Sequence, residues 1–368
     1  MKILCIVGAR PNFIKIAPLQ RAFLAYPGIQ SKIVHTGQHY DTVMSDIFFT
    51  QLDLPKPDYY LGVQAGTTTQ QTADILHKFE KVLTIERPDW VLVVGDVTST
   101  LACTLAAVQH GIRVTHVEAG LRSGDRQMPE ERNRLVTDAL ADLLFVTEQA
   151  GVENLQREGI SAEKIHFVGN VMIDSLVEYL PSSRKLNTLA ELGLGAGSYG
   201  LITLHRPSNV DTENGLRTLL MLIENVANLR RMLFPMHPRT RANLARFGLY
   251  TKLEAIPNVQ ILEPQGYLEF LNLMRQAAVV ITDSGGIQEE TTYLQVPCLT
   301  FRESTERPVT VALGTNQLIA DLKPETARQC VIDILSGQLK TGQIPPLWDG
   351  QAARRIAKIM YEATYPKS

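Results

Sequence analysis

Two lengths of hydrophobic pattern alternate along the chain. Short runs rich in Val, Ile and Leu predict buried strands in the first half of the chain, at 2–8, 31–37, 90–96, 113–120 and 143–148. Longer stretches with apolar residues at helical spacing lie between them at 68–86 and 98–111, the second ending at Gly111. Continuous apolar strands separated by helices predict a parallel sheet covered on both faces.

The pattern breaks at 180–198, where Ser, Gly and Pro accumulate, as is typical of a connection between domains. The alternation then restarts, with strands expected at 199–205, 231–237, 258–264, 278–284 and 296–301. Helices are expected at 213–229 and 350–363. We therefore predict an α/β protein of two Rossmann-like, doubly wound domains, with ligands at the carboxyl ends of the strands.

Composition narrows the range of partners. A chain of 368 residues favours two domains, and a net charge of −2 with a pI near 6.5 gives no reason to expect nucleic acid or an anionic membrane. No stretch approaches the ~20 apolar residues of a membrane span. The four cysteines show no C-x-x-C spacing, which favours free thiols in a reducing compartment. We expect a soluble, cytoplasmic protein.

Acidic residues follow two neighbouring strands of the first predicted sheet. Asp96 ends one strand and Glu118 the next, and Glu130 opens a helix after Pro129. Clustered carboxylates are suited to general acid and base catalysis. Simpler interpretations remain open: Asp96 or Thr98 caps the following helix, Glu118 forms a salt bridge with a nearby arginine (Arg122 or Arg126), and the acids after Pro129 only favour the helix start.

Histidine and arginine occupy comparable places in the second half. His205-Arg206 ends one predicted strand and His237 ends the next, which suggests a rim that faces phosphate. "TDSGGIQEE" (282–290) reads as a strand, then a glycine pair, then a helix. Such a helix start either is simply capped or cradles an anion with its backbone N–H groups.

The first strand leads into "GARPNFIK", which places Arg10 and Lys15 at another helix start. This segment is neither the dinucleotide fingerprint nor a P-loop, so we expect neither NAD nor a P-loop nucleotide. The histidine and cysteine spacings also give no reason to expect a metal site.

Seven motifs together resemble the non-hydrolysing UDP-N-acetylglucosamine 2-epimerases. They are, in order, "GARPNFIKIAP", "GDVTSTLA", "HVEAGLRS", "MPEERNR", "HRPSN", "DSGGIQEE" and "STERP". The resemblance implies a GT-B-type fold with the active site in the inter-domain cleft, and a homodimer. It implies an N-terminal domain over 1–180 with the acid/base residues, a UDP-binding domain over 181–350, and a final helix over 351–368 that crosses back.

The resemblance also implies the reaction, which needs no cofactor. UDP-GlcNAc becomes UDP-ManNAc by elimination of UDP to 2-acetamidoglucal, followed by re-addition of UDP. Asp96, Glu118 and Glu130 would be the acid/base candidates, with His205 near the diphosphate. Further residues would hold the UDP-sugar: Ser284, Gly285 and Gly286 at the phosphates, Glu290 at the ribose, Arg10 and Phe270 at the uracil, and Lys15, Arg134, His237 and Arg307 elsewhere in the site.

Some segments differ from the family pattern. The sequence continues from His205 as Arg206-Pro207-Ser208-Asn209 and reads "QHYD" at 38–41, so these residues do not predict a second, activating UDP-GlcNAc site. "GARPNF" and "HRPSN" also resemble a branch that acts on UDP-2,3-diacetamido-2,3-dideoxy-glucuronic acid. Three other functions share part of this pattern: a hydrolysing epimerase, a glycosyltransferase, and a non-catalytic sensor. The three acids favour the isomerase over the last two.

Overall fold

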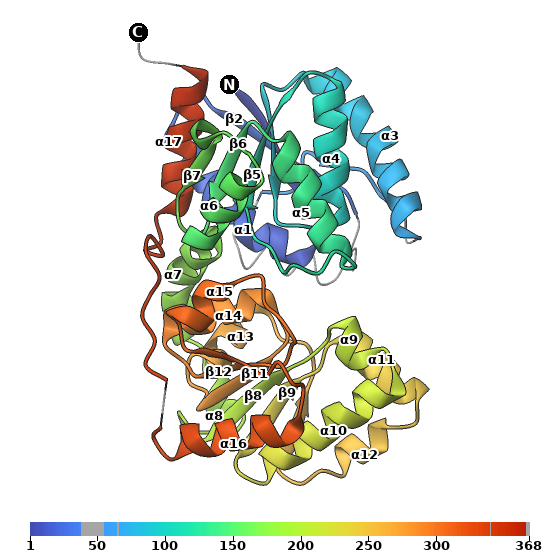
Figure 1. Ribbon diagram of the computed structural model, residues 1–368, viewed down its shortest axis with the longest axis vertical. Helices are drawn as coiled ribbons and strands as arrows, with labels where there is room; N and C mark the ends of the chain where they lie inside the picture. Colours follow the sequence, from blue (N-terminus) through green and yellow to red (C-terminus); the bar gives the residue numbers. More distant parts are fainter. Residues whose placement is uncertain (38–54, 65, 339, 366–368) are drawn as a thin grey trace. The chain divides into compact units, whose positions relative to one another are not determined.

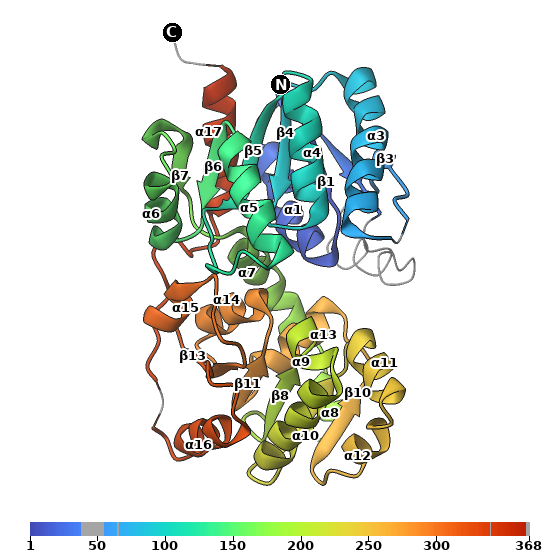
Figure 2. The same ribbon diagram turned by 45° about the vertical axis from the view of Figure 1, so that its right-hand side comes forward.

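The computed structural model describes residues 1–37, 55–64, 66–338 and 340–365. The chain divides into two compact units, Met1–Glu178 with Pro346–Ser368, and Tyr179–Pro345. Each unit is built around one parallel sheet (Figures 1 and 2). The segment "QHYD" lies outside the described residues.

The first unit contains a seven-stranded sheet in the order β3-β2-β1-β4-β5-β6-β7. Its strands are β1 (Lys2–Val7), β2 (Gln30–His35), β3 (Tyr59–Tyr60), β4 (Trp90–Val94), β5 (Arg113–Ala119), β6 (Leu143–Val146) and β7 (Ile165–Phe167). Its helices are α1 (Arg10–Phe23), α3 (Thr68–Glu86), α4 (Thr98–Gln109), α5 (Pro129–Leu140), α6 (Gln149–Arg157) and α17 (Ala352–Thr364), with a 3-10 turn at Ala162–Lys164.

Helices cover both faces of this sheet. α3, α4 and α5 lie side by side over one face, and α1 packs with α17 on the other (Figure 1). The strands are continuous apolar runs because both faces are covered, and all five residues of β4 are buried. Strands β2 and β3 lie on one side of β1, and β4 with the later strands lies on the other side. Ligands of doubly wound sheets bind at the point where the order changes in this way.

Helix α7 (Val171–Arg184) begins in the first unit and ends in the second. The break expected at 180–198 is therefore partly wrong, because the helix continues through Pro181 to Arg184. A proline inside a helix costs a hydrogen bond, but packing of the surrounding turns can outweigh that cost.

The second unit contains a six-stranded sheet in the order β10-β9-β8-β11-β12-β13. Its strands are β8 (Tyr199–Thr203), β9 (Arg231–Pro235), β10 (Val259–Leu262), β11 (Val279–Thr282), β12 (Cys298–Thr300) and β13 (Asn316–Leu318). Its helices are α8 (Thr188–Glu191), α9 (Pro207–Val210), α10 (Glu213–Ala227), α11 (Pro238–Arg246), α12 (Tyr250–Glu254), α13 (Tyr267–Met274), α14 (Gly285–Leu294), α15 (Pro308–Ala312) and α16 (Pro324–Leu335).

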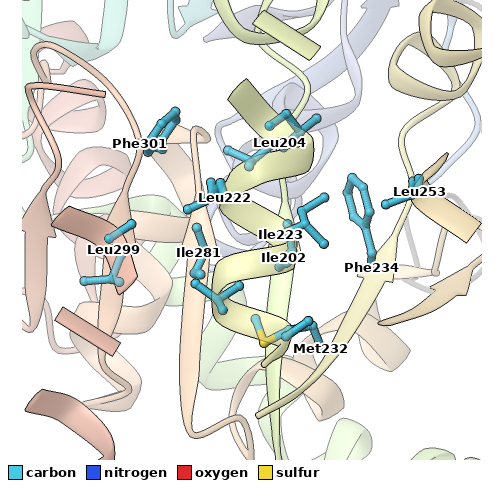
Figure 3. Packing of buried hydrophobic residues seen from close by; sticks show 14 of the residues in the cluster. Ile202, Leu204, Leu222, Ile223, Met232, Phe234, Leu253, Ile281, Leu299 and Phe301 are labelled. Atoms are coloured by element: carbon cyan, nitrogen blue, oxygen red, sulfur yellow. The ribbon is translucent and has the colours of Figure 1, made fainter. Parts of the chain in front are cut away.

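The core of the second unit lies between its sheet and α10 with α16. Leu222 and Ile223 of α10 pack against strand residues such as Ile202, Phe234 and Ile281 (Figure 3). These side chains are fully buried, and burial of each contributes roughly 1.5–3 kcal/mol. The order of strands reverses here between β8 and β11, so this sheet also has a ligand-binding edge.

Candidate active site

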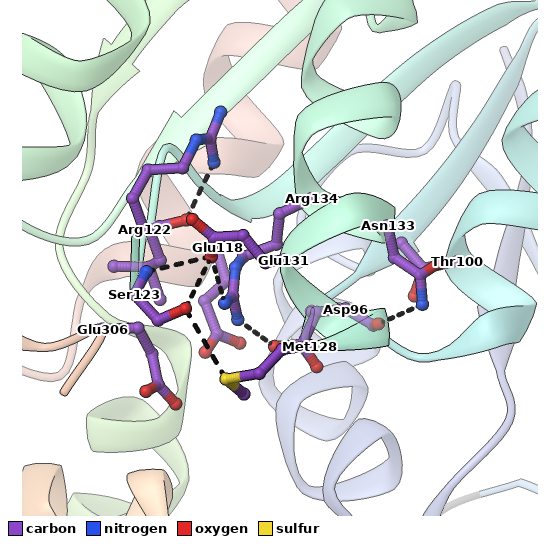
Figure 4. Close-up of polar contacts among 12 residues, drawn as sticks. Asp96, Thr100, Glu118, Arg122, Ser123, Met128, Glu131, Asn133, Arg134 and Glu306 are labelled. Carbon is purple, nitrogen blue, oxygen red and sulfur yellow. Dashed lines mark hydrogen bonds and ion pairs between the residues drawn. The ribbon is translucent and has the colours of Figure 1, made fainter. Parts of the chain in front are cut away.

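Asp96 follows β4 in the first unit and is held by α5. Its Oδ2 accepts a 2.5 Å hydrogen bond from Nη1 of Arg134, whose side chain is only 1 % exposed. The Asn133 side chain donates to the Asp96 carbonyl at 2.8 Å (Figure 4). Helix α4 has Val97 as its N-cap residue and no side-chain cap, so the interpretation of Asp96 or Thr98 as a cap is wrong. The Asp96 carboxylate is therefore fixed by a cation.

Glu118 lies at an irregular point of β5. The ladder between β5 and β6 shifts register between Val117 and Ala119, and Glu118 has a φ of 75°. A non-glycine residue in this region stores backbone strain of about 1–3 kcal/mol, which is typical of functional sites. The carboxylate forms an ion pair with Lys15, and both side chains are nearly buried. Arg122, one alternative partner expected from sequence, instead pairs with Asp138 and Glu158.

The neighbouring glutamates Glu130 and Glu131 of α5 differ in surroundings. Glu131 is 2 % exposed and accepts hydrogen bonds from the backbone N–H groups of Ser123 and Gly124 and from the Ser123 hydroxyl. Its Oε2 also accepts a 2.6 Å bond from Arg134 (Figure 4). Glu130 is half-buried and has no hydrogen bond or ion pair within the described part of the chain. Glu131 therefore organises the turn, while Glu130 is available for a substrate.

The start of α1 is organised by Asn12. Its Oδ1 accepts from the N–H groups of Gly8 and Ala9, at 3.2 and 2.9 Å, and its Nδ2 donates to the Val94 carbonyl. These contacts tie the first helix to the end of β4. Arg10 begins α1, but its side chain is outside what the structure describes.

In the second unit, His205 is organised by a buried acid. Asp283 is fully buried and accepts hydrogen bonds from the backbone N–H groups of His205 and Arg206, while His205 Nδ1 lies 3.2 Å from Asp283 Oδ1. Burial opposes its charge, but the contacts with His205, Arg206 and Asn209 hold the pKa of Asp283 below its ordinary value. The His205 ring stacks on His237 at a centroid distance of 5.0 Å.

An arginine lies directly against the start of α14. A side-chain carbon at Gly285 would lie 2.3 Å from Arg307 Nη1, so any larger residue here would require the guanidinium to move. Ser284 is the N-cap residue but its side chain does not cap the helix. Positive charge at a helix start with uncapped N–H groups suits an anion such as a diphosphate.

Three arginines surround one buried acid beside this helix. Glu306 forms ion pairs with Arg206, Arg302 and Arg307 at 3.4, 2.8 and 2.6 Å. Although burial opposes its charge, these arginines hold the pKa of Glu306 far below its ordinary value. Glu306 therefore stays ionised and fixes the arginines. Arg307 also pairs with Glu289 at 2.7 Å.

Glu290 lies within α14 and is 3 % exposed. It accepts a 2.9 Å hydrogen bond from the Tyr267 hydroxyl. Burial raises the pKa of Glu290 to about 7, an effect that the Tyr267 hydroxyl partly opposes. Phe270 follows Tyr267 by three residues on α13, and is half-buried.

Comparison with known proteins assigns the chain to a family. The sequence model of UDP-N-acetylglucosamine 2-epimerase matches residues 21–361. The chain belongs to this family. It is 41 % identical to a UDP-N-acetylglucosamine 2-epimerase of Methanococcus maripaludis, over 99 % of this chain and 100 % of that protein. It is 40 % identical to the UDP-2,3-diacetamido-2,3-dideoxy-D-glucuronate 2-epimerase of Pseudomonas aeruginosa, over 98 % of this chain and 99 % of that protein.

Solved structures of this epimerase family share the fold. The UDP-GlcNAc 2-epimerase of Methanocaldococcus jannaschii, in complex with UDP-GlcNAc and UDP, matches with a TM-score of 0.92 and 42 % identity, over 98 % of this chain and 99 % of that chain. The predicted resemblance and the two Rossmann-like α/β domains of GT-B type are thus confirmed. Over the described ranges, no helix of this epimerase-family chain is long and apolar enough to cross a membrane.

Several organising residues of this epimerase-family chain are not identified from sequence. These residues form contacts that organise the site, but they lie in motifs whose neighbouring residues are the candidates. They are Asp283, Glu306, Asn12 and Glu131. Asp283 carried a usable signal, since an acid that ends a buried strand is as unusual as Glu118. Within the described residues, no three His, Cys, Asp or Glu side chains are grouped to hold a metal ion.

Proposed function

We propose that this chain interconverts UDP-GlcNAc and UDP-ManNAc by inverting C2. The observation that carries the proposal is the set of acids on the first unit. Asp96 and Glu118 follow neighbouring strands, each paired with a buried cation, and Glu130 opens the next helix without a described partner. Family membership supports the same activity.

The chemistry requires a proton to leave C2 and UDP to leave C1. The electron pair of the C2–H bond forms the C1–C2 double bond of 2-acetamidoglucal as the C1–O bond breaks toward UDP. Protonation of C2 on the other face and re-addition of UDP to C1 complete the change. A base, an acid and a site that stabilises diphosphate charge are needed. Asp96, Glu118 and Glu130 are the proposed acid/base residues.

The proposed UDP-binding residues lie mainly on the second unit. Ser284, Gly285 and Gly286 at the start of α14 would bind the diphosphate with backbone N–H groups, helped by Arg307. His205, which is held by Asp283, would contact the leaving phosphate. The His237 ring stacks on the His205 ring. Glu290 would accept from the ribose hydroxyls, and Phe270 with Arg10 would flank the uracil. Lys15 and Arg134 would act by holding Glu118 and Asp96.

Exchange in D₂O tests this function. The pure protein is incubated with UDP-GlcNAc in D₂O, and the products are followed by NMR. We expect UDP-ManNAc and deuterium at C2 of both sugars. Free ManNAc with UDP would instead establish a hydrolysing epimerase, and a lack of C2 exchange would refute the isomerase.

A second candidate substrate is UDP-2,3-diacetamido-2,3-dideoxy-glucuronic acid. The 40 % identity with the Pseudomonas aeruginosa enzyme equals that with the UDP-N-acetylglucosamine 2-epimerase of Methanocaldococcus jannaschii, and "HRPSN" resembles the branch that acts on the uronate. Measuring kcat/KM for both sugars in parallel distinguishes the two. A ratio above about tenfold in favour of the uronate would reassign the substrate.

We also propose that the protein works as a homodimer in the cytoplasm. The homodimer is implied by the family resemblance, and the cytoplasm is supported by the four free cysteines, Cys5, Cys103, Cys298 and Cys330. Light scattering on the purified protein would give the mass of one or two chains of 40.9 kDa. Fractionation of the source cells tests the compartment.

A further inference from the structure

A buried carboxylate of the second unit shares its two oxygens among three arginines. Glu306 lies in the segment between β12 and α15 and is 3 % exposed. Its Oε1 lies 2.6 Å from Nη1 of Arg307 and 3.4 Å from Nη2 of Arg206. Its Oε2 lies 2.8 Å from Nη2 of Arg302. Two guanidinium groups therefore share one oxygen, and a third pairs with the other.

The shared oxygen lies against the residue at which α14 begins. A side-chain carbon at Gly285 would lie 2.3 Å from Arg307 Nη1 and 3.1 Å from Glu306 Oε1. The N-cap residue Ser284 does not bind the helix start with its side chain. The first N–H groups of a helix need an acceptor from outside the helix, and an anion is a suitable one. The paired arginines are thus next to an anion-binding helix start.

Both arginines that share Oε1 have a second fixed point. Nε of Arg206 donates to the Asp283 carbonyl at 3.0 Å, and Nε of Arg307 donates to Glu289 Oε1 at 2.7 Å. Asp283 precedes α14 and Glu289 lies within it. Each guanidinium is therefore anchored to the α14 segment through Nε, while Glu306 binds an Nη nitrogen of both. Glu306 is the contact that the two arginines have in common.

We propose that Glu306 is a positioning residue for the diphosphate of the UDP-sugar. It holds Arg206 and Arg307 together at the start of α14, so that two positive charges and the helix N–H groups act on one anion. Like charges repel, and without the shared carboxylate these guanidinium groups would separate. Arg302 pairs with the second oxygen and keeps the carboxylate in place. This role rests on the proposed function, because it requires UDP to bind at α14.

Positioning and net charge predict opposite effects of Glu306→Gln. The ion-paired groups of the cluster are three cations and two acids, with one net positive charge: Arg206, Arg302, Arg307, Glu289 and Glu306. Loss of the Glu306 charge makes the cluster more positive, which by itself would strengthen the attraction for a diphosphate. Glutamine, however, offers only one acceptor oxygen, and its amide N–H groups face a donor. Positioning therefore predicts weaker binding.

Binding of UDP and of uridine to the full-length protein tests the role of Glu306. Calorimetry gives the affinity for UDP, and competition against UDP gives the affinity for uridine, which lacks the diphosphate. We expect Glu306→Gln to weaken UDP binding at least about tenfold and uridine binding less than about twofold. The matched control is Glu303→Gln, which removes the same charge from an exposed position in the same segment and should change neither affinity.

A shorter acid serves if Glu306→Gln does not fold. Glu306→Asp keeps the charge but withdraws the carboxylate by about 1.5 Å, the length of one C–C bond. We expect the affinity for UDP to fall at least about threefold with that for uridine unchanged, as for a small misplacement of binding groups. Equal loss for UDP and uridine would reduce Glu306 to a structural residue and contradict the proposal.

The positioning role and the proposed function fail separately. Unchanged or tighter UDP binding in Glu306→Gln, or unchanged UDP binding in Glu306→Asp, would refute the positioning role and leave the epimerase activity of the wild type untouched. A wild-type protein that binds uridine as tightly as UDP would refute a diphosphate site at α14, and with it the proposed function.

Discussion

The two adjacent glutamates at the start of α5 differ in how many contacts the fold gives them. Glu131 accepts four hydrogen bonds and is nearly inaccessible, while Glu130 is half-buried and has no partner in the described ranges. Removal of a buried acceptor leaves its donors unsatisfied, which costs about 1–3 kcal/mol. A partly exposed carboxylate with no protein partner has no such structural cost. Removal of the carboxylate is therefore expected to cost stability at Glu131 but not at Glu130.

Glu130→Gln and Glu131→Gln should accordingly give different defects. We expect Glu130→Gln to lose at least about 100-fold in kcat, as for an acid/base residue, with an unchanged melting temperature. Glu131→Gln should lower the free energy of unfolding by about 1–3 kcal/mol. Activity assays with thermal melts of both variants check this. Full activity in Glu130→Gln would contradict its assignment.

Gly285 is a second residue at which a single added carbon atom should change ligand binding. In Gly285→Ala the new methyl would lie 2.3 Å from Arg307 Nη1, so the guanidinium must leave the start of α14. We expect the affinity for UDP to fall about tenfold or more, measured by calorimetry, because an anion-binding arginine is displaced. Gly195→Ala is the control, since nothing lies within 4 Å of a side-chain carbon there. Equal UDP affinity in both variants would argue against an anion site at α14.

At the scale of elements, strand ends and helix starts do most of the positioning. Helix α17 is an example, because its first N–H groups are capped by a side chain from another helix. Asp174 of α7 accepts from the N–H groups of Ala352 and Ala353, at 3.1 and 2.6 Å. A helix distant in sequence is thereby attached to the first unit.

The stability of this attachment should depend on pH. Burial raises the pKa of Asp174 from 3.8 to about 6, although the N–H groups of Ala353 and Ala352 oppose the rise. The folded state then binds a proton that the unfolded state has lost, so this contribution is full below about pH 4 and is lost as pH rises through 6. The loss is at most about 3 kcal/mol. In Asp174→Asn the group is always neutral, and its urea midpoint relative to wild type should rise between pH 4 and pH 7.

The elements differ in how well sequence predicts them. Helix α3 has the expected bounds of 68–86. The strand that precedes Asp96 and the strand that contains Glu118 are also predicted, because long periodic runs and buried apolar runs are local signals. The strands β7 and β13, of three residues each, are too short to show a period. Helix α7 ran past Pro181 because packing overrode a local preference.

Contacts between distant residues were also beyond the sequence. Glu118 meets Lys15 across 103 residues, and His116 meets Asp138 across 22. The local sequence around each residue does not predict its partner, because the fold brings the two segments together. The candidate residues themselves were predicted from motifs, and their catalytic roles remain proposals.

At the scale of the whole molecule, the two units divide the proposed tasks. The acids belong to the first unit and the start of α14 to the second. Each set is fixed by buried ion pairs within its own unit. Turnover and UDP binding should therefore be separable by mutation.

Asp96→Asn should lose at least about 100-fold in kcat while UDP affinity changes less than about threefold. The reason is that the variant keeps its shape and its contact with Arg134 but loses the charge that takes the proton. Isothermal titration with UDP, alongside the D₂O exchange assay, makes the measurement. Loss of UDP binding in this variant would mean that Asp96 belongs to the UDP site.

The strands at the borders of both sheets are short, and this limits how copies of the chain can associate. β3, β7, β10 and β13 have two, three, four and three residues. A border this short offers few open backbone groups to a strand from another molecule, which protects against aggregation. Within the described part of the chain, these strands therefore favour pairing of copies through side chains on helices and loops over continuation of a sheet from one molecule into the next.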